Sequence, residues 1–302
     1  LREHRDALRV GSAALDFLDD LRERLVSVES TGIKISDAGQ KLLEEMEPLV
    51  SDLFGLSEVE ERIRQAFGLK QVIVVPGDSD SSPQTKKDLG RAGAAALRKL
   101  ASRGDVIAVT GGSTMAEVAE HLTSSPNFKG CLFVPARGGL GESVELQANT
   151  IASTMAKQTN CPYRLLHVPD HLSEEAYQSL IQEPNVQEVL RDIRASRIVV
   201  HGIGDAMVMA RRRKVDEKTI ADLKAEGALA EAFGYYFDRR GNVVHKMPTV
   251  GLRLEDIRQM ETVIAVAGGR SKGEAIAAVL RYGHEDVLVT DEAAALEIVR
   301  CL

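Results

Sequence analysis

A double glycine followed by two hydroxyl side chains carries the clearest chemical signal in this sequence. Gly111, Gly112, Ser113 and Thr114 come directly after an apolar run, and an apolar helical spacing begins after them. Glycine lets the backbone approach a ligand closely, and the N–H groups of a first helical turn favour an anion. The turn therefore predicts a seat for an anion, most simply a phosphate. A strand-to-helix connection that needs glycine only for its backbone angles explains one such turn equally well.

The same order of features returns near the C-terminus. An apolar run at 263–267 leads into a double glycine, a hydroxyl and two basic residues, Arg270 and Lys272. A cation at a helix start is unfavourable unless an anion lies beside it. The apolar segments 131–134 and 198–201 also end in glycine and polar residues. Because loops after parallel strands gather at one crevice, these turns together indicate a ligand with more than one anionic group.

The elements that must position these turns alternate between strand and helix from Lys70 onward, which predicts a doubly wound α/β domain with a parallel sheet. We expect strands at 71–75, 106–110, 131–134, 163–168, 197–201, 263–267 and 286–290. We expect helices at 84–102, 114–122, 142–157, 172–181, 185–194, 205–213, 217–231, 272–281 and 291–300. Residues 235–245 read as a hairpin.

The N-terminal part has a different pattern. A charged helical spacing at 2–24 precedes two short alternating segments around Thr31-Gly32, and a capped helix starts at Ser36 or Asp37. This order is typical of the back half of a winged helix-turn-helix, and we expect its first helices to lie upstream of Leu1. Against DNA binding, residues 2–24 hold five arginines and six acidic side chains, a poor charge for a helix entering a groove.

We therefore predict three parts: a partial winged helix-turn-helix at 1–47, a linker helix at 48–69, and an effector-binding and oligomerisation domain at 70–302. The apolar face of the 48–69 helix suits a linker, a dimer contact or ordinary packing against the body, and the sequence leaves these open.

Composition limits the class of protein. The 302 residues are 44% hydrophobic, enough for a sizeable core, and the net charge of −7 argues against a protein that coats nucleic acid. Three widely spaced cysteines predict neither disulfides nor a zinc site. We find no apolar run of about 18 residues and no signal-peptide pattern, so we expect a cytoplasmic protein without a membrane partner.

Eight motifs from the body resemble the effector-binding domain of SorC/DeoR-type sugar regulators, and the resemblance covers nearly all of residues 50–302. The motifs are Gly77-Asp-Ser-Asp-Ser-Ser-Pro83, Val109-Thr-Gly-Gly-Ser-Thr114, Phe133-Val-Pro-Ala-Arg-Gly-Gly-Leu-Gly141, Gln147-Ala-Asn149, Tyr163-Arg-Leu-Leu166, Val200-His-Gly-Ile-Gly204, Glu231-Ala-Phe-Gly-Tyr-Tyr-Phe237 and Ala267-Gly-Gly-Arg-Ser-Lys272. The first 45 residues match more loosely, through the wing and the helix after it.

The resemblance implies a transcriptional repressor of glycolytic genes that binds operator DNA. Because operators read by such modules are commonly two-fold, we expect a homodimer or a dimer of dimers. The resemblance also implies a phosphosugar isomerase-like fold and a phosphorylated sugar effector, with fructose 1,6-bisphosphate expected, and no cofactor or metal. Carried over by motif, the ligand-binding residues are Gly111, Gly112, Ser113, Thr114, Arg137, Gly138, Leu140, Gln147, Arg212, Glu231 and Lys272.

The roles implied by the resemblance differ among these residues. The Gly111–Thr114 turn would hold a phosphate, Arg137 and Lys272 would supply positive charge, and Arg212 would bind a phosphate with a bidentate fork. Gln147 and Glu231 would hydrogen-bond sugar hydroxyls. Read without the family, Arg212 fits equally a solvated arginine at a helix C-terminus, and Glu231 a carboxylate at the end of a surface helix.

The alternative function is a sugar-phosphate isomerase, which needs a general base and an acid within reach of the sugar. His201, Asp205, Glu231 and His245 are the candidates. None stands in a recognisable catalytic motif, so we expect a regulator and not an enzyme.

Overall fold

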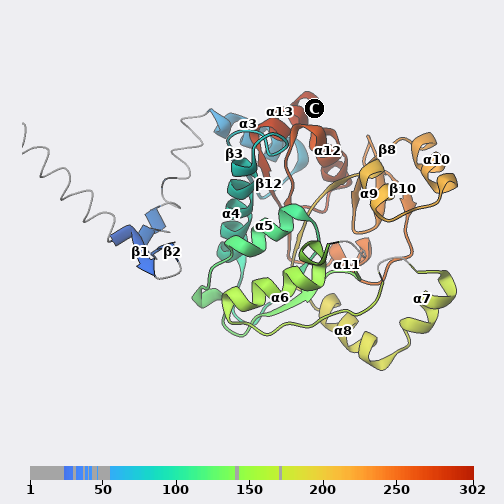
Figure 1. The fold of residues 1–302 in the computed structure, drawn as a ribbon. Coiled ribbons are helices and arrows are strands. Elements are labelled where there is room, and N and C mark those ends of the chain that lie inside the picture. The colour runs from blue at the N-terminus through green and yellow to red at the C-terminus, as the bar shows by residue number, and fades with distance from the viewer. Residues whose placement is uncertain are drawn as a thin grey trace, which may run out of the picture. The chain divides into compact units, whose positions relative to one another are not determined.

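The computed structural model describes residues 24–29, 32–36, 38–39, 41–42, 46, 55–139, 143–169 and 172–302 (Figure 1). The chain divides into two compact units, Leu1–Ser57 and Glu58–Leu302, and the division falls inside the segment predicted as a linker helix. None of the helices in the described ranges is long and apolar enough to cross a membrane.

In the first unit, β1 (Val26–Glu29) and β2 (Gly32–Ile35) pair antiparallel, from Val26 opposite Ile35 to Glu29 opposite Gly32. This confirms the predicted pair of short strands. The Oγ of Ser36 accepts a hydrogen bond from the Gly39 amide at 3.0 Å, which is the contact of a helix N-cap. Residues 2–23 of the helical segment predicted at 2–24 lie outside the described residues, as does the turn at 30–31.

The second unit is built on a six-stranded parallel sheet with the strand order β3-β12-β11-β6-β4-β5. Its strands are β3 (Gln71–Val75), β4 (Val106–Val109), β5 (Leu132–Pro135), β6 (Ile198–His201), β11 (Thr262–Val266) and β12 (Val287–Asp291). Six of the seven predicted strands are thus confirmed, each within one residue. Strands β6, β11 and β12 are buried along their whole length, as expected of parallel strands covered on both faces.

Helices cover both faces of this sheet. The helices are α3 (Leu56–Phe67), α4 (Pro83–Leu100), α5 (Ser113–His121), α6 (Ala148–Thr159), α7 (Glu174–Leu180), α8 (Pro184–Arg194), α9 (Ala206–Arg212), α10 (Glu217–Ala225), α11 (Leu254–Ile257), α12 (Gly273–Tyr282) and α13 (Glu292–Arg300), with the short 3₁₀ turns η1 (Pro126–Phe128), η2 (Val144–Leu146) and η3 (Arg270–Lys272). Figure 1 shows α4, α5 and α6 side by side on one face, where they pack in succession. The β4–α5–β5 and β11–α12–β12 crossovers run in opposite directions along the sheet, so right-handed connections place α5 and α12 on opposite faces. The predicted doubly wound fold is confirmed.

A second sheet of four antiparallel strands stands beside the first, in the order β10-β9-β8-β7. It comprises β7 (Gly204–Asp205), β8 (Ala228–Ala232), β9 (Tyr235–Asp238) and β10 (Val243–Lys246). The β9–β10 pair confirms the predicted hairpin. A small core that includes Ala210, Leu223, Tyr236 and Met247 joins this sheet to α9 and α10.

Three expectations from sequence were wrong in this unit. Residues 163–168 form no strand, because only Tyr163 bridges to β5 and the backbone of Leu166 is held by the Asn149 side chain, at 2.9 and 3.1 Å. The helix predicted at 217–231 ends at Ala225, and its last part is strand β8. The helix predicted at 142–157 is interrupted at Gln147, because the Leu146 carbonyl accepts from the Gly112 amide at 2.8 Å.

Candidate functional site

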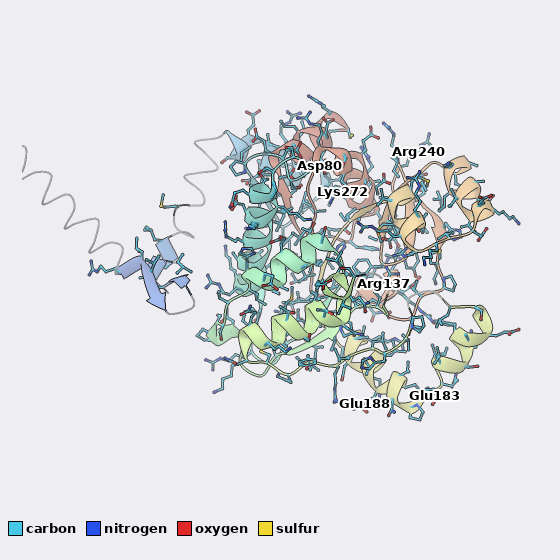
Figure 2. The ribbon with its side chains drawn as sticks, in the orientation of Figure 1. Asp80, Arg137, Glu183, Glu188, Arg240 and Lys272 are labelled. Atoms are coloured by element: carbon cyan, nitrogen blue, oxygen red, sulfur yellow. The ribbon has the colours of Figure 1, made fainter. Side chains whose placement is uncertain are left out.

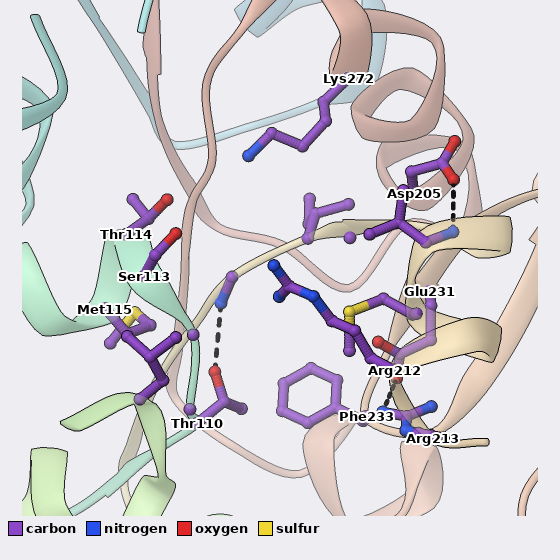
Figure 3. A pocket seen from close by; sticks show the side chains of 18 of the residues that line it. Thr110, Ser113, Thr114, Met115, Asp205, Arg212, Arg213, Glu231, Phe233 and Lys272 are labelled. Carbon is purple, nitrogen blue, oxygen red and sulfur yellow. Dashed lines mark hydrogen bonds and ion pairs between the residues drawn. The ribbon is translucent and has the colours of Figure 1, made fainter. Parts of the chain in front are cut away.

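A cavity of about 290 Å³ opens at the carboxyl ends of β4 and β6. These strands are neighbours, and the chain leaves them in opposite directions along the sheet, towards β5 and β11. Ligands of open α/β sheets bind at such a switch point, because diverging loops leave a crevice there. The Oγ1 of Thr110, after β4, accepts from the Gly202 amide, after β6, at 3.2 Å and ties the two strand ends together (Figure 3).

The N-terminus of α5 forms one wall of the cavity. Gly112 is the N-cap with φ 121° and ψ 160°, a conformation that only glycine adopts readily, and it has no side chain to occupy the amides of the first turn. A Cβ at Gly111 would lie 2.5 Å from the carbonyl oxygen of Leu146, so this position also requires glycine. Figure 3 shows the hydroxyls of Ser113 and Thr114 next to each other at this wall. The geometry suits an anion.

Cationic side chains reach the cavity from other elements. Figure 3 shows Arg212 from α9 and Lys272 from η3 extending into the cavity from the side opposite Ser113 and Thr114. Burial lowers the pKa of Lys272, an effect that the carboxylates of Asp80 and Asp291 oppose and that the nearby charge of Arg212 reinforces. An anionic ligand would relieve this loss of hydration by pairing with the ammonium group.

Glu231 on β8 joins two buried arginines. Its Oε1 accepts from Arg213 Nη2 at 2.7 Å, from Arg137 Nη1 at 3.2 Å and from the Gly234 amide at 2.6 Å. Burial alone would raise the pKa of Glu231, but the charges of Arg213 and Arg137 outweigh burial and lower it. Glu231 is therefore an ionised carboxylate inside the cavity wall and not the surface carboxylate of the alternative reading.

The second double glycine differs from the first. Its amides already bind carboxylates of the protein: Gly269 N donates to Asp291 Oδ2 at 2.6 Å, and Ser271 N donates to Asp80 Oδ2 at 2.8 Å. Figure 2 shows Asp80 and Lys272 in the same part of the body. The protein's own carboxylates thus occupy the amides of this turn, and the expectation that the turn offers its amides to a ligand is wrong.

Nine of the eleven residues predicted from the resemblance line this one cavity. They are Gly111, Gly112, Ser113, Thr114, Arg137, Gln147, Arg212, Glu231 and Lys272. Gly138 is not among the lining residues: its amide donates to the Val250 carbonyl at 3.0 Å, and a Cβ there would lie 2.6 Å from the Val168 carbonyl oxygen. Leu140 lies outside the described residues.

The sequence did not single out three other lining residues as ligand contacts, Asp205, Arg213 and Phe233. The sequence offers Asp205 only as a candidate for acid–base catalysis, and in the structure its Oδ1 caps α9 by accepting from Val208 N at 2.8 Å. Arg213 adjoins the predicted Arg212 but points to the buried Glu231 instead. The signal for Phe233 was hidden because β8 had been predicted as helix.

The candidates for acid–base catalysis are poorly suited to it. His201 is fully buried, and burial lowers its pKa to about 4. The lowered pKa of Glu231 makes it a weak base, and Asp205 is engaged as a helix cap. His245 lies on β10 with its ring against Tyr236, at 5.8 Å between ring centroids.

Comparison with known proteins also indicates sugar binding, in agreement with the polar cavity described above. Residues 51–300 match the family described as "Putative sugar-binding domain". Two relatives named "Central glycolytic genes regulator", from Priestia megaterium and Bacillus subtilis, are 46% and 44% identical over 97% of this chain and 85% of their own length.

A solved structure supports the fold match. The crystal structure of the "putative SorC family transcriptional regulator" from Enterococcus faecalis is 46% identical, covers 80% of this chain and 99% of its own, and has a TM-score of 0.75. These similar proteins are regulators, which confirms the expectation of a regulator over an enzyme. The chain belongs to the SorC/DeoR family of sugar-binding transcriptional regulators.

Proposed function

We propose that this protein is a cytoplasmic repressor of glycolytic genes whose operator binding responds to fructose 1,6-bisphosphate held in the switch-point cavity. The gene class comes from the two relatives named as regulators of central glycolytic genes. The ligand comes from the charge and layout of the cavity.

The observation that carries the ligand proposal is the distribution of charge. Four cationic side chains line the cavity against two carboxylates, and one of those carboxylates, Glu231, is already engaged by two of the cations, Arg137 and Arg213. Arg212 and Lys272 are the other two cations, and the α5 N-terminus adds the partial charge of a helix dipole. One phosphate on the α5 turn and a second near Arg212 and Lys272 would use both groups of donors.

A neutral sugar would add no negative charge to a cavity that four cationic side chains line. A monophosphate would match only one of the two groups of donors, whereas a sugar bisphosphate matches both. The uncharged part of the ligand would then lie between them, close to Gln147, whose amide suits a sugar hydroxyl.

Operator binding and assembly complete the proposal. The β1–β2 pair and the capped helix after it fit the wing region of a winged helix-turn-helix. Operators read by such modules are commonly two-fold, so we propose a homodimer or a dimer of dimers. The ligand would change operator affinity only through a difference in its own affinity for the two arrangements of the subunits.

Calorimetric titration tests the ligand. We expect wild-type protein to bind fructose 1,6-bisphosphate more tightly than fructose 6-phosphate, glucose 6-phosphate or dihydroxyacetone phosphate, without turnover by NMR. In Lys272→Met the affinity should fall about tenfold to a hundredfold, because a hydrogen bond to a charged group contributes about 1.5–3 kcal/mol. The exposed Lys218 on α10 provides the matched control, and Lys218→Met should bind like wild type.

Three results would contradict the proposal. Equal affinities of Lys272→Met and Lys218→Met would place the ligand elsewhere. Conversion of any sugar phosphate would reinstate the isomerase. If operator affinity is the same with and without fructose 1,6-bisphosphate, the proposal that this ligand regulates DNA binding is wrong.

A further inference from the structure

The turn between β8 and β9 holds a bulky residue in a conformation that suits glycine. Ala232 pairs with Tyr235, so the hairpin turn consists of Phe233 and Gly234 alone, with φ values of 54° and 85°. Two-residue turns with positive φ at both positions favour Asn-Gly, because Asn and Gly enter the left-handed region at little cost. A phenylalanine there is an outlier, since its Cβ crowds the following carbonyl.

The surroundings force this conformation. Glu231 accepts from the Gly234 amide at 2.6 Å while it binds Arg213 and Arg137, and the Gly234 carbonyl accepts from Met247 N at 2.8 Å. The turn is therefore held on both sides by groups that the fold has already placed. Backbone strain of this kind persists where many surrounding contacts fix the conformation, and strained residues are often found at functional sites.

The position of the Phe233 ring indicates the role of this side chain. Phe233 is the one aromatic residue among the described residues that line the cavity, and Figure 3 shows its ring beside Arg212, between Thr110 and Glu231. Behind it, the ring packs on His201, with 4.5 Å between centroids. His201 is fully buried, and burial lowers its pKa to about 4, so this backing is rigid and uncharged at neutral pH.

We propose that Phe233 is a specificity-determining residue whose ring packs against the carbon skeleton of the phosphorylated sugar. This inference rests on the proposed function. The cations and the α5 turn bind phosphate whatever carries it, and an aromatic ring adds contact only with the C–H groups between the phosphates. Phe233 thus makes the cavity selective for a phosphorylated sugar over a phosphate anion without a carbon skeleton.

The test compares fructose 1,6-bisphosphate with inorganic pyrophosphate, which carries two phosphates and no carbon. Phe233→Asn removes the ring and installs the residue that the turn prefers. Calorimetry should show a loss of about tenfold in affinity for fructose 1,6-bisphosphate, equivalent to about 1.4 kcal/mol, and a change of less than about twofold for pyrophosphate.

A second variant guards against misfolding. If thermal unfolding shows that Phe233→Asn does not fold, Phe233→Leu keeps the apolar bulk without the aromatic face, and a smaller loss that is still confined to the sugar bisphosphate is expected. If the wild-type chain binds the sugar bisphosphate but not pyrophosphate, its binding already depends on the carbon skeleton of the ligand. The loss of affinity for the sugar bisphosphate in the Phe233 variants then decides whether Phe233 is the cause.

The contrary outcomes separate the two proposals. Unchanged affinity for fructose 1,6-bisphosphate, or equal losses for both ligands, overturns the role of Phe233 and leaves the proposed function intact. Wild-type protein that binds pyrophosphate but none of the sugar phosphates overturns both proposals, as does wild-type protein that binds neither ligand.

Discussion

Replacing Glu231 by glutamine removes a buried negative charge from between two buried cations. Glu231 is 4% exposed, and Arg137 and Arg213 are each 7% exposed. The glutamine oxygen can still accept a hydrogen bond, but it cannot balance the charge of two guanidinium groups. The variant therefore keeps the desolvation of both arginines and loses the charge that offsets it.

The expected loss follows from that imbalance. Breaking a buried ion pair by removing one partner costs about 3–5 kcal/mol, and the remaining amide oxygen favours the lower end, about 3 kcal/mol. For a body of this size that loss corresponds to a melting temperature lower by about 6–12 °C, at about 2–4 °C per kcal/mol. Thermal unfolding followed by circular dichroism measures it.

The pH dependence gives a second measurement of the same substitution. The folded pKa of Glu231 lies below its unfolded value, because the charges of Arg213 and Arg137 outweigh burial. Its stabilising contribution is therefore present above the unfolded pKa and is lost as the pH falls through the folded pKa. The gap in free energy of unfolding between wild type and Glu231→Gln should narrow in acid.

A matched control and a coupling measurement make the result decisive. Glu226 is exposed at the end of α10, so Glu226→Gln should change stability by less than about 0.5 kcal/mol. Glu231→Gln and Arg213→Gln remove the same contact, so together they should cost less than the sum of the single losses by at least about 1 kcal/mol. If Glu231→Gln is as stable as Glu226→Gln, or if the two losses simply add, Glu231 does not hold the arginines in place.

Two further substitutions test a buried carboxylate and the cavity wall. Glu285 is 4% exposed at its side chain, and burial raises its pKa from 4.5 to about 7. Since the folded pKa lies above the unfolded one, wild-type stability should lose up to about 3 kcal/mol as the pH rises through this range, and urea unfolding should show no such loss from this group in Glu285→Gln. Gly111→Ala places a methyl group 2.5 Å from the Leu146 carbonyl oxygen, so calorimetry should show weaker phosphate binding and unfolding a loss of about 1–3 kcal/mol. Gly202→Ala is its control for stability, because a Cβ there meets its nearest atom at 3.8 Å, and equal losses of stability in the two variants would exclude the steric explanation.

The sheet was predictable because its strands are short apolar runs bounded by glycine and polar residues. In β6, β11 and β12 every residue is buried, so hydrophobicity alone marks them. The segment 163–168 looks similar in sequence, yet it pairs with β5 only near Tyr163, and the side-chain amide of Asn149 satisfies the backbone of Leu166. A side-chain partner from a distant helix leaves no trace in local periodicity.

The antiparallel sheet was harder to predict. Residues 228–232 are mostly alanine, which favours helix by propensity, and the structure makes them strand β8 by pairing with β7 and β9. Tertiary pairing overrides weak local preference here. The same error concealed the Phe233–Gly234 turn, because a helix predicted up to residue 231 leaves no room for a hairpin.

The sequence by itself determined the fold class, the family and the first anion-binding turn, because each depends on residues adjacent in the chain or on motifs in a constant order. Only the tertiary structure decided which cations and backbone amides pair with which carboxylates. Arg137 and Glu231 are 94 residues apart, and Gly269 and Asp291 are 22 apart. Their pairing follows from strand order and burial. For that reason two double glycines of nearly the same sequence differ, one facing a cavity and the other bound by the protein's own carboxylates.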